Sequence, residues 1–231
     1  MRHDHAAIAD AIAAELALDG ARSGARLPTQ KDLGVRFGAS RHTIRRAIDL
    51  LERRGVLGGR QGSGTYVTGQ LVDYRISSRT RYNENVRPLD PSPTIEFLEL
   101  QTRRATPELS RALAIARQAP IHDLMVLRRT NREPLCLARH YLSVDRFPSL
   151  ADHLEHASGI TDLLRRLGTD DFQRNNSAIS ARMPSNEEAF LLAIPRDSPV
   201  VVLEGRNIDP AGVPVEISTS VWPAARIRVH V

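Results

Sequence analysis

The chain contains one cysteine, one lysine and no apolar run long enough to cross a lipid bilayer. A single thiol, Cys136, cannot form a disulfide within the chain, and it suits a reducing compartment. A membrane-spanning helix needs about 20 consecutive apolar residues, and no segment approaches this length. Residues 1–19 alternate apolar and acidic side chains with helical period, which indicates an amphipathic helix rather than a secretion signal. Together these features predict a cytoplasmic protein.

The motifs of common enzymes are also missing. The sequence has no GxGxxG loop, no metal-ligand constellation and no pattern that would activate a nucleophile. His153 and His156 have the i, i+3 spacing at which two helical histidines can share a metal, but no third ligand lies near them in the sequence. A solvated helix face is the simpler interpretation of this pair. We therefore expect no catalytic residue, no metal and no cofactor.

Positive charge is concentrated in one part of the chain. The segment 20–64 holds ten basic and three acidic residues, a net charge of +7 that exceeds the +5 of all 231 residues. The remainder is therefore slightly acidic, and the basic segment has the charge expected of a surface that attracts phosphate groups. Lys31 is the only lysine, so arginine is the general basic residue here and no single arginine is diagnostic.

The basic segment has the local signals of two short helices joined by a tight turn. Thr29 with Asp32 three positions later forms a capping-box pattern at the start of the first helix. Gly38 is placed to end that helix, and Ser40 is placed to cap the next one. The second helix has one apolar stripe at i, i+3, i+4 and i+7 spacing, made of Ile44, Ala47, Ile48 and Leu51.

The other face of the second helix begins with basic and hydrogen-bonding side chains, among them Arg41, His42 and Arg45. A helix-turn-helix reads DNA with this part of its second helix, which enters the major groove by its N-terminal turn. A two-stranded ribbon follows, with β-type residues at 56–57 and 65–67 and a glycine-rich tip at 60–64 that can approach DNA closely. An ordinary amphipathic helical hairpin is the alternative, but the turn, caps, basic surface and ribbon together favour DNA binding.

These residues resemble the winged-helix motif of the GntR family of bacterial regulators. The matching positions are Leu27, Pro28, Leu33, Phe37, Ser40, Arg41, Thr43, Arg45, Ala47, Leu51, Gly55, Gly62, Gly64, Thr65 and Val67. Gln30 and Gly34 depart from the usual acid and alanine. The resemblance implies that Arg41, His42 and Arg45 contact bases or lie near them. It also implies that the phosphates or the minor groove are contacted by Lys31, Ser40, Thr43, Gln61 and Gly62.

The rest of the chain alternates strand and helix patterns. Strands are predicted at 95–103, 172–183, 200–208 and 215–222, with a hairpin over 121–141 that turns near residues 131–134. Helices are predicted at 107–116, 148–156, 160–167 and 185–194, and residues 226–231 are predicted to close the sheet. We therefore predict an α+β protein with a DNA-binding domain at 1–70, a linker and entry segment at 71–93, and an antiparallel domain at 94–231.

This order of elements resembles the UTRA effector domain of the HutC branch of the GntR family, whose fold is chorismate-lyase-like. Further matches at 79–85, 127–131, 135–141 and 214–216 resemble members of this branch that regulate phosphonate utilisation. The resemblance implies an effector site made of Arg81, Tyr82, Asn83, Arg128, His140, Tyr141, Ser158, Thr161, Glu216 and Trp222, and Arg139 is added as a third arginine that could bind the acid group. Arginine suits a phosphate or phosphonate group because its planar fork donates two hydrogen bonds.

The arginines and His140 also have simpler explanations. An arginine in this region can instead pair with Glu84, Asp123 or Asp145, and His140 can satisfy a hydrogen bond in the core. The segment Ser158–Gly159 precedes a predicted helix, whose free N–H groups would suit an anion.

The resemblance implies a homodimeric repressor that binds a near-palindromic DNA operator and is released by a small phosphonate or phosphate-type effector. A regulator that responds to a sugar phosphate or another small acid is one alternative. The others are a chorismate-lyase-like enzyme with an accessory DNA-binding domain, and an architectural DNA binder without an effector. The sequence has no catalytic pattern, and its second part is long enough to form a complete ligand-binding domain. Both points favour the ligand-responsive regulator.

Overall fold

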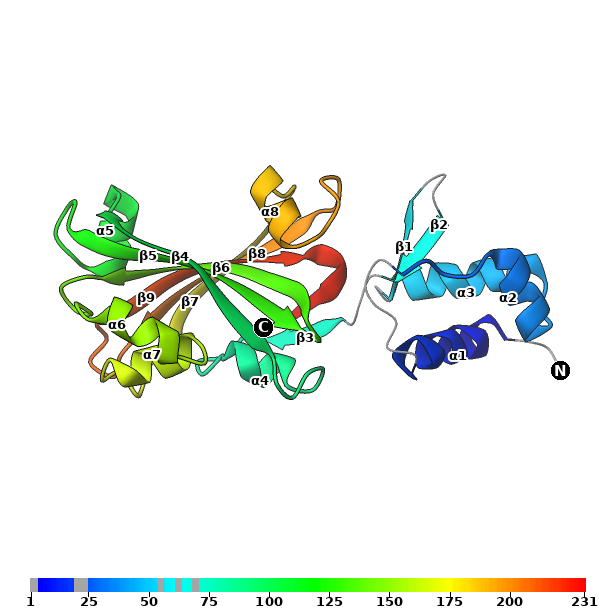
Figure 1. The fold of residues 1–231 in the computed structure, drawn as a ribbon, viewed down its shortest axis with the longest axis horizontal. Coiled ribbons are helices and arrows are strands. Elements are labelled where there is room, and N and C mark those ends of the chain that lie inside the picture. The colour runs from blue at the N-terminus through cyan, green and yellow to red at the C-terminus, as the bar shows by residue number, and fades with distance from the viewer. Residues whose placement is uncertain (1–3, 19–24, 54–55, 61–63, 68–70) are drawn as a thin grey trace. The chain divides into compact units, whose positions relative to one another are not determined.

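The computed structural model describes residues 4–18, 25–53, 56–60, 64–67 and 71–231. The chain divides into two compact units, Met1–Leu71 and Val72–Val231, and each has its own hydrophobic core (Figure 1). No helix within the described ranges is long and apolar enough to cross a membrane. The α+β class predicted from the sequence is confirmed.

The first unit is a helix-turn-helix with a two-stranded wing. Its elements are α1 (His5–Leu18), α2 (Gln30–Phe37), α3 (Arg41–Arg53), β1 (Leu57–Arg60) and β2 (Gly64–Val67). At the start of α2 the Thr29 hydroxyl accepts from Asp32 N at 3.3 Å, and Asp32 Oδ2 accepts from Thr29 N at 3.3 Å. Gly38 ends α2 with a left-handed φ of 58°, and Ser40 Oγ accepts from Thr43 N at 3.1 Å. The predicted capping box, helix end and second cap are all confirmed.

The core of the first unit forms where the apolar stripe of α3 meets α1 and α2. Ile44, Ala47, Ile48 and Leu51 are all buried, as the stripe predicts. The wing strands β1 and β2 are antiparallel, and the segment before α2 pairs with β2 through Leu27 N to Thr65 O and Val67 N to Ala25 O, both at 2.8 Å. The wing is therefore attached by backbone hydrogen bonds to the extended segment that leads into α2.

The second unit is built on a six-stranded sheet in which every neighbouring pair is antiparallel. The strands in spatial order are β4 (Thr94–Arg104), β5 (Pro120–Thr130), β6 (Glu133–Ser143), β9 (Pro214–Pro223), β8 (Val200–Ile208) and β7 (Gln173–Arg182). The β5–β6 hairpin turns through Asn131 and Arg132, whose φ angles of 51° and 68° are both positive. Two such residues are typical of a type I′ turn, which matches the twist of a hairpin.

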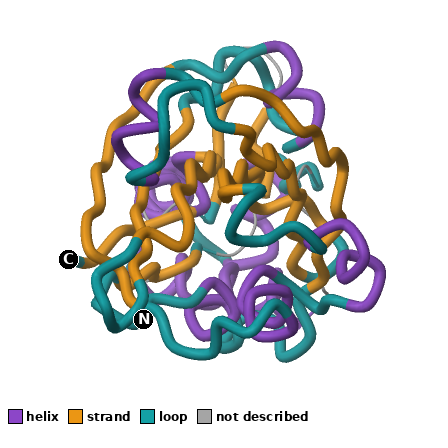
Figure 2. The backbone as a smooth tube through the Cα atoms, turned by 90° about the vertical axis from the view of Figure 1, so that its left-hand side faces the viewer, coloured by secondary structure: helices purple, strands orange, loops and turns teal. Residues whose placement is uncertain are grey.

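Helices lie on both faces of this sheet (Figures 1 and 2). One face carries α5 (Pro107–Leu113) and α8 (Asn186–Leu191), and we call it the outer face. The other, the inner face, carries α4 (Tyr82–Val86), α6 (Leu150–His153), η1 (Leu154–His156) and α7 (Ile160–Arg166). The inner face holds the larger core, which includes the fully buried Trp222. A short turn, η2 (Ala224–Arg226), follows β9.

The C-terminal strand does not have the partner predicted for it. Instead of closing the six-stranded sheet, β10 (Ile227–His230) pairs in parallel with β3 (Val72–Arg75), from Ile227 opposite Val72 to His230 opposite Arg75. The prediction was wrong because a four-residue strand carries no signal for a partner more than 150 positions away. The pair joins the two ends of the second unit and places β3 and α4 within it.

Helix α8 provides a test of local stability. Ser185 and Glu188 form a capping box, in which Glu188 N donates to Ser185 Oγ at 3.1 Å. We expect Ser185→Ala to lower the free energy of unfolding of the second unit by about 1 kcal/mol. Urea denaturation followed by the fluorescence of Trp222, the only tryptophan, measures this directly. Thr29→Ala removes the equivalent cap in the first unit and is expected to leave the Trp222 transition unchanged; a loss confined to that control would contradict the prediction.

Candidate functional site

The polar surface of α3 lies opposite its buried stripe. Arg41, His42 and Arg45 are all exposed, and Lys31 and Ser40 are exposed as well. Thr43 is half-buried, and its hydroxyl lies 2.8 Å from that of Ser40. The structure therefore presents six of the eight predicted DNA-contacting residues on or next to the N-terminal turns of α2 and α3. The other two, Gln61 and Gly62, lie outside the described residues.

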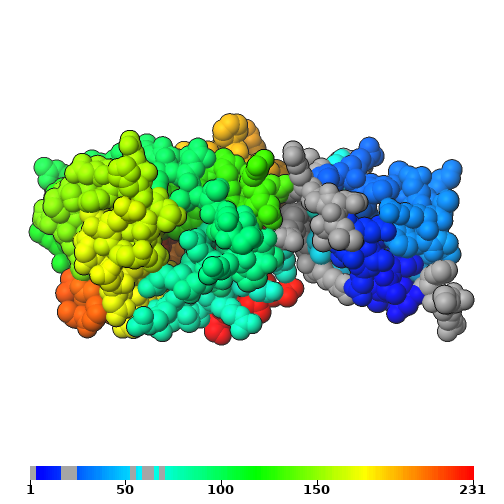
Figure 3. Space-filling view, turned by 60° about the horizontal axis from the view of Figure 1, so that its bottom comes forward, coloured from blue at the N-terminus to red at the C-terminus, as the bar shows by residue number. Residues whose placement is uncertain are grey.

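The second unit contains a cavity of ≈ 240 Å³ on the inner face of its sheet. Its walls come from all six strands of the sheet, from β3, from the start of α4 and from the start of α7. The surface is hollowed between the α4 and α7 segments, where the strands form the floor (Figure 3). Eight of the eleven predicted effector residues line this cavity: Arg81, Tyr82, Asn83, Arg128, His140, Ser158, Thr161 and Glu216.

Two of the cavity arginines are held by aromatic rings and uncharged acceptors. The Arg81 guanidinium lies 4.0 Å above the Phe172 ring and donates to Phe172 O at 2.8 Å. The Arg128 guanidinium lies 4.5 Å above the ring of Tyr82, and Arg128 is only 9% exposed. These contacts position the cations without neutralising them.

Arg128 is connected through His140 to Glu216, the only buried carboxylate among the described residues that line the cavity. Arg128 Nη2 lies 3.3 Å from His140 Nε2, and His140 Nδ1 lies 2.9 Å from Glu216 Oε1. A guanidinium only donates, so His140 Nε2 must accept and the histidine proton must lie on Nδ1, where it is donated to Glu216. The geometry therefore defines a neutral His140 between a cation and an anion.

The pKa values of this pair agree with that assignment. Burial lowers the pKa of His140 and outweighs the opposing effect of the Glu216 carboxylate, and the nearby charges of Arg128 and Arg174 lower that pKa further. Burial raises the pKa of Glu216, but the charge that His140 carries when protonated, the hydrogen bond from His140 and the charges of Arg174 and Arg128 together lower it. At neutral pH the lowered pKa of His140 leaves the ring neutral, and the lowered pKa of Glu216 leaves its carboxylate ionised.

Arg174 is a cavity residue that sequence reasoning missed. The register between β7 and β8 shifts between Arg174 and Asn176, so one extra residue bulges from β7. Because a bulge re-aims the side chains next to it, Arg174 lies on the inner face beside Asn207. Its guanidinium lies over Gly205 of β8, where a Cβ would overlap it. The strand pattern of residues 172–183 contains no signal for this bulge.

The start of α7 is already occupied by a carboxylate of the chain itself. Ser158 donates to Asp162 Oδ2 from its backbone N at 2.9 Å and from its hydroxyl at 3.2 Å. Asp162 also pairs with Arg165 and Arg166. Ser158 and Thr161 line the cavity as predicted, but an external anion at Ser158 would have to displace Asp162.

Three of the predicted effector residues do not line the cavity. Trp222 is fully buried behind its wall, with its ring 5.1 Å from Tyr74 and 5.7 Å from Tyr82. Arg139 and Tyr141 flank His140 on β6, and successive residues of a strand point to opposite faces. Since His140 lies on the inner face, its two neighbours lie on the outer face.

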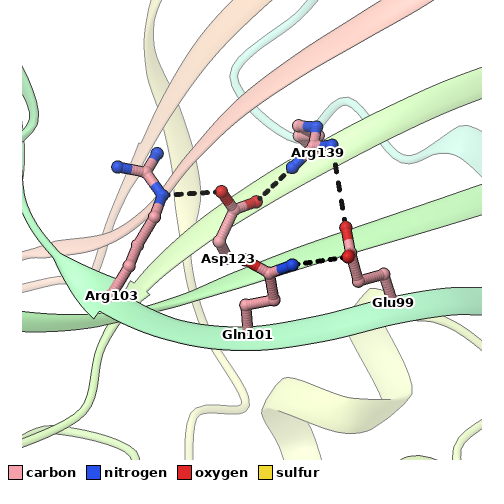
Figure 4. A network of polar contacts seen from close by, with 5 residues as sticks. All are labelled: Glu99, Gln101, Arg103, Asp123 and Arg139. Carbon is pink, nitrogen blue, oxygen red and sulfur yellow. Dashed lines mark hydrogen bonds and ion pairs between the residues drawn. The ribbon is translucent and has the colours of Figure 1, made fainter.

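Arg139 belongs to a separate polar network on the outer face (Figure 4). The buried Asp123 accepts from Arg103 Nε at 2.7 Å and from Arg139 Nη1 at 3.0 Å, and Arg139 also pairs with Glu99 at 3.8 Å. The Arg103 guanidinium lies 5.3 Å from the centre of the Tyr141 ring. The alternative explanation of Arg139, pairing with Asp123, is therefore the one that the structure shows.

A metal site is not evident in the described ranges, where no three histidine, cysteine or carboxylate side chains are grouped as metal ligands.

A helix-turn-helix with a wing, followed by an α+β unit with a cavity that contains several charged side chains, defines a DNA-binding regulator with a ligand-binding domain. The model of the bacterial regulatory proteins of the gntR family matches residues 5–67, and that of the UTRA domain matches residues 90–228. The chain belongs to the GntR family, in the HutC branch that carries a UTRA domain.

Named relatives agree with the family. The chain is 33% identical over 209 residues to the probable transcriptional regulator PhnF of Escherichia coli, covering 90% of this chain and 86% of the relative. It is 28% identical to the mannosyl-D-glycerate transport/metabolism system repressor MngR of Escherichia coli, covering 84% and 80%. The crystal structure of PhnF from Mycobacterium smegmatis has the same fold, with a TM-score of 0.68 at 24% identity, covering 94% and 96%. The protein is thus a ligand-responsive transcriptional regulator rather than an enzyme.

The buried histidine makes the stability of the second unit depend on pH. His140 has a folded pKa below its ordinary value of 6.5, so as the pH falls below 6.5 the unfolded chain takes up a proton that the folded chain does not. Stability is therefore lost on acidification, by up to about 1.4 kcal/mol per pH unit for one proton. We expect His140→Asn, which cannot titrate, to reduce this slope in urea titrations followed by Trp222 fluorescence between pH 7.5 and 5.5. The exposed His156→Asn is the control, and an unchanged slope in His140→Asn would refute the assignment.

Proposed function

We propose that this protein is a cytoplasmic, homodimeric repressor that leaves its operator when a small phosphonate or phosphate-type effector binds in the cavity of its UTRA domain. We infer the chemical class of the effector from three guanidinium groups that lie around one cavity, those of Arg81, Arg128 and Arg174. In the part of the chain that the structure covers, none of the three forms an ion pair with a carboxylate.

The energetics of buried charge support an anionic ligand. A desolvated cation without a counter-ion is costly, whereas a phosphate or phosphonate group offers three oxygens to the planar forks of neighbouring arginines. Of the described carboxylates that line the cavity only Glu216 is buried, and Asp162 is already paired with Arg165 and Arg166, so the group formed by Glu216 and the three arginines has an excess of positive charge. An effector with a doubly charged acid group would neutralise that excess.

The size of the cavity and the resemblance to phosphonate-utilisation regulators favour a short phosphonate. A volume of ≈ 240 Å³ suits a small metabolite. The likeness to MngR, a repressor of a mannosyl-D-glycerate system, supports a sugar-derived acid as the second candidate. Direct titration of both ligand classes separates them.

DNA recognition is proposed to follow the helix-turn-helix geometry, with Arg41, His42 and Arg45 at base edges. One such unit reads only a few base pairs, so we propose that a dimer binds a near-palindrome with half-sites about 34–36 Å apart, or a multiple of this. In this proposal residues 1–70 bind DNA, residues 71–93 form the linker and the entry segment that carries Arg81, and residues 94–231 complete the effector site and dimerise. Arg81 follows β3, the first strand after the DNA-binding unit, so we propose that its engagement by an anion is transmitted to the DNA-binding domains.

The contribution of the recognition helix is measurable with one substitution. We expect Arg45→Ala to weaken binding to the cognate operator by about 1–3 kcal/mol, because a bidentate contact to a base is lost. Fluorescence anisotropy at a fixed salt concentration measures the change. Arg196→Ala removes the same charge from an exposed site of the second unit and is the matched control. Equal affinities of Arg45→Ala and wild type would show that α3 does not read the DNA as proposed.

The anion site is tested by isothermal titration calorimetry with short phosphonates and sugar phosphates. We expect Arg128→Met to reduce effector affinity at least tenfold, since a charged hydrogen bond is worth about 1.5–3 kcal/mol. Gly205→Ala keeps every charge but forces the Arg174 guanidinium out of its place, so it is also expected to weaken binding. The exposed Arg117→Ala is the control. If no anion binds, or if both cavity variants bind as tightly as the control, the proposed site is incorrect.

A further inference from the structure

Four buried polar atoms on the inner face of the sheet have no hydrogen-bond partner among the described residues. They are Arg174 Nε and Ser177 Oγ of β7, Asn207 Oδ1 of β8 and Glu216 Oε2 of β9. All four residues line the cavity, and they lie on three neighbouring strands. We call these four residues the polar wall.

The two acceptors of the polar wall are placed as a pair. Asn207 and Glu216 are directly opposite each other in the β8–β9 register, and they are only 5% and 3% exposed. The other oxygen of Glu216 is already used, because it accepts from His140 Nδ1 at 2.9 Å. What remains is one carboxylate oxygen and one amide oxygen, on residues that pair across neighbouring strands, each without a hydrogen bond from a described residue.

Such an arrangement is costly unless something else supplies the donors. An unsatisfied buried polar atom costs about 1–3 kcal/mol, and more when it is charged. Native proteins leave few of these, and they concentrate at places where a ligand or an ordered water completes the hydrogen bonds. The chain also leaves space here, since Gly205, two residues before Asn207 on β8 and opposite Ser177, gives the Arg174 guanidinium room to lie over the sheet.

Resting on the proposed function, we propose that the effector is bifunctional: its acid group binds the arginines, and a second group carrying hydrogen-bond donors binds Glu216 Oε2 and Asn207 Oδ1. The ligand class is a short phosphonate or phosphate that ends in a hydroxyl or ammonium group. A plain alkyl phosphonate would satisfy the arginines and bury both acceptors against a methyl group. A site that is built to bond a donor rejects the analogue without it much more strongly than it rejects a change of size.

Three probes of nearly equal shape separate the second group from the acid group. These are propylphosphonate, 2-hydroxyethylphosphonate and 2-aminoethylphosphonate, which end in a methyl, a hydroxyl and an ammonium group. In calorimetric titrations of the full chain we expect the hydroxyl or the ammonium compound, or both, to bind at least about tenfold more tightly than propylphosphonate. The hydroxyl compound also controls for net charge, because it lacks the extra positive charge of the ammonium compound.

A substitution in the polar wall identifies the residues responsible. Asn207→Leu has a similar shape but removes one acceptor, so the preference over propylphosphonate is expected to fall several-fold while propylphosphonate itself binds as before. Asn176→Leu, at an exposed position of β7, is the control and should keep the preference.

The outcomes distinguish this inference from the function on which it rests. If the three phosphonates bind equally, water completes the polar wall and the inference is overturned, while the anion site stands. A preference that survives Asn207→Leu undiminished also overturns it. If none of the three binds, and inorganic phosphate and glucose 6-phosphate fail too, the anion site itself is refuted.

Discussion

The neutral His140 held between Arg128 and Glu216 is the interaction on which the cavity depends. It crosses three neighbouring strands, β5, β6 and β9, and it fixes a cation at one end and an ionised carboxylate at the other. If His140 were charged, it would be a third positive charge beside Arg128 and Arg174 on this face. If Glu216 were neutral, the histidine would lose the charged acceptor that orients it. The hydrogen-bonded series Arg128–His140–Glu216 therefore sets the charges on this face of the cavity and the direction of the hydrogen bonds that a ligand meets.

The two faces of the sheet use the same residue types for different purposes. On the outer face Arg103 and Arg139 are both paired with the buried Asp123, which satisfies all three groups within the chain. On the inner face Arg128 and Arg174 have no carboxylate partner in the described structure, and Glu216 keeps one oxygen free. A network in which every charged group has a partner stabilises the fold, whereas we propose that a ligand completes the network whose groups lack one. The difference lies in the partners and not in the arginines themselves.

Local patterns in the sequence predicted local structure well. The caps at Thr29 and Ser40 and the apolar stripe that includes Ile44 depend on residues within one or two turns, and the structure contains each of them. The β5–β6 hairpin was predictable for the same reason. By contrast, the pairing of β10 with β3 joins segments at opposite ends of a domain, and nothing in a four-residue strand specifies so distant a partner.

The candidate site was predictable only in part. The resemblance to the UTRA family directed attention to Arg81, Arg128, His140 and Glu216, which the structure brings to one cavity. Strand alternation alone shows that neighbours of His140 such as Arg139 cannot share its face. Arg174 could not be found in this way, because its direction depends on a β-bulge and on the missing side chain of Gly205.

The tautomer of His140 tests the central claim most directly. In ¹⁵N-labelled protein, with the signal of His140 assigned by its loss in His140→Asn, the imidazole nitrogens report which of them carries the proton. The account predicts a neutral ring at neutral pH, protonated at Nδ1 and unprotonated at Nε2, and a ring that stays neutral as the pH falls below 6.5. A charged imidazolium, or a proton on Nε2 facing Arg128, would contradict it.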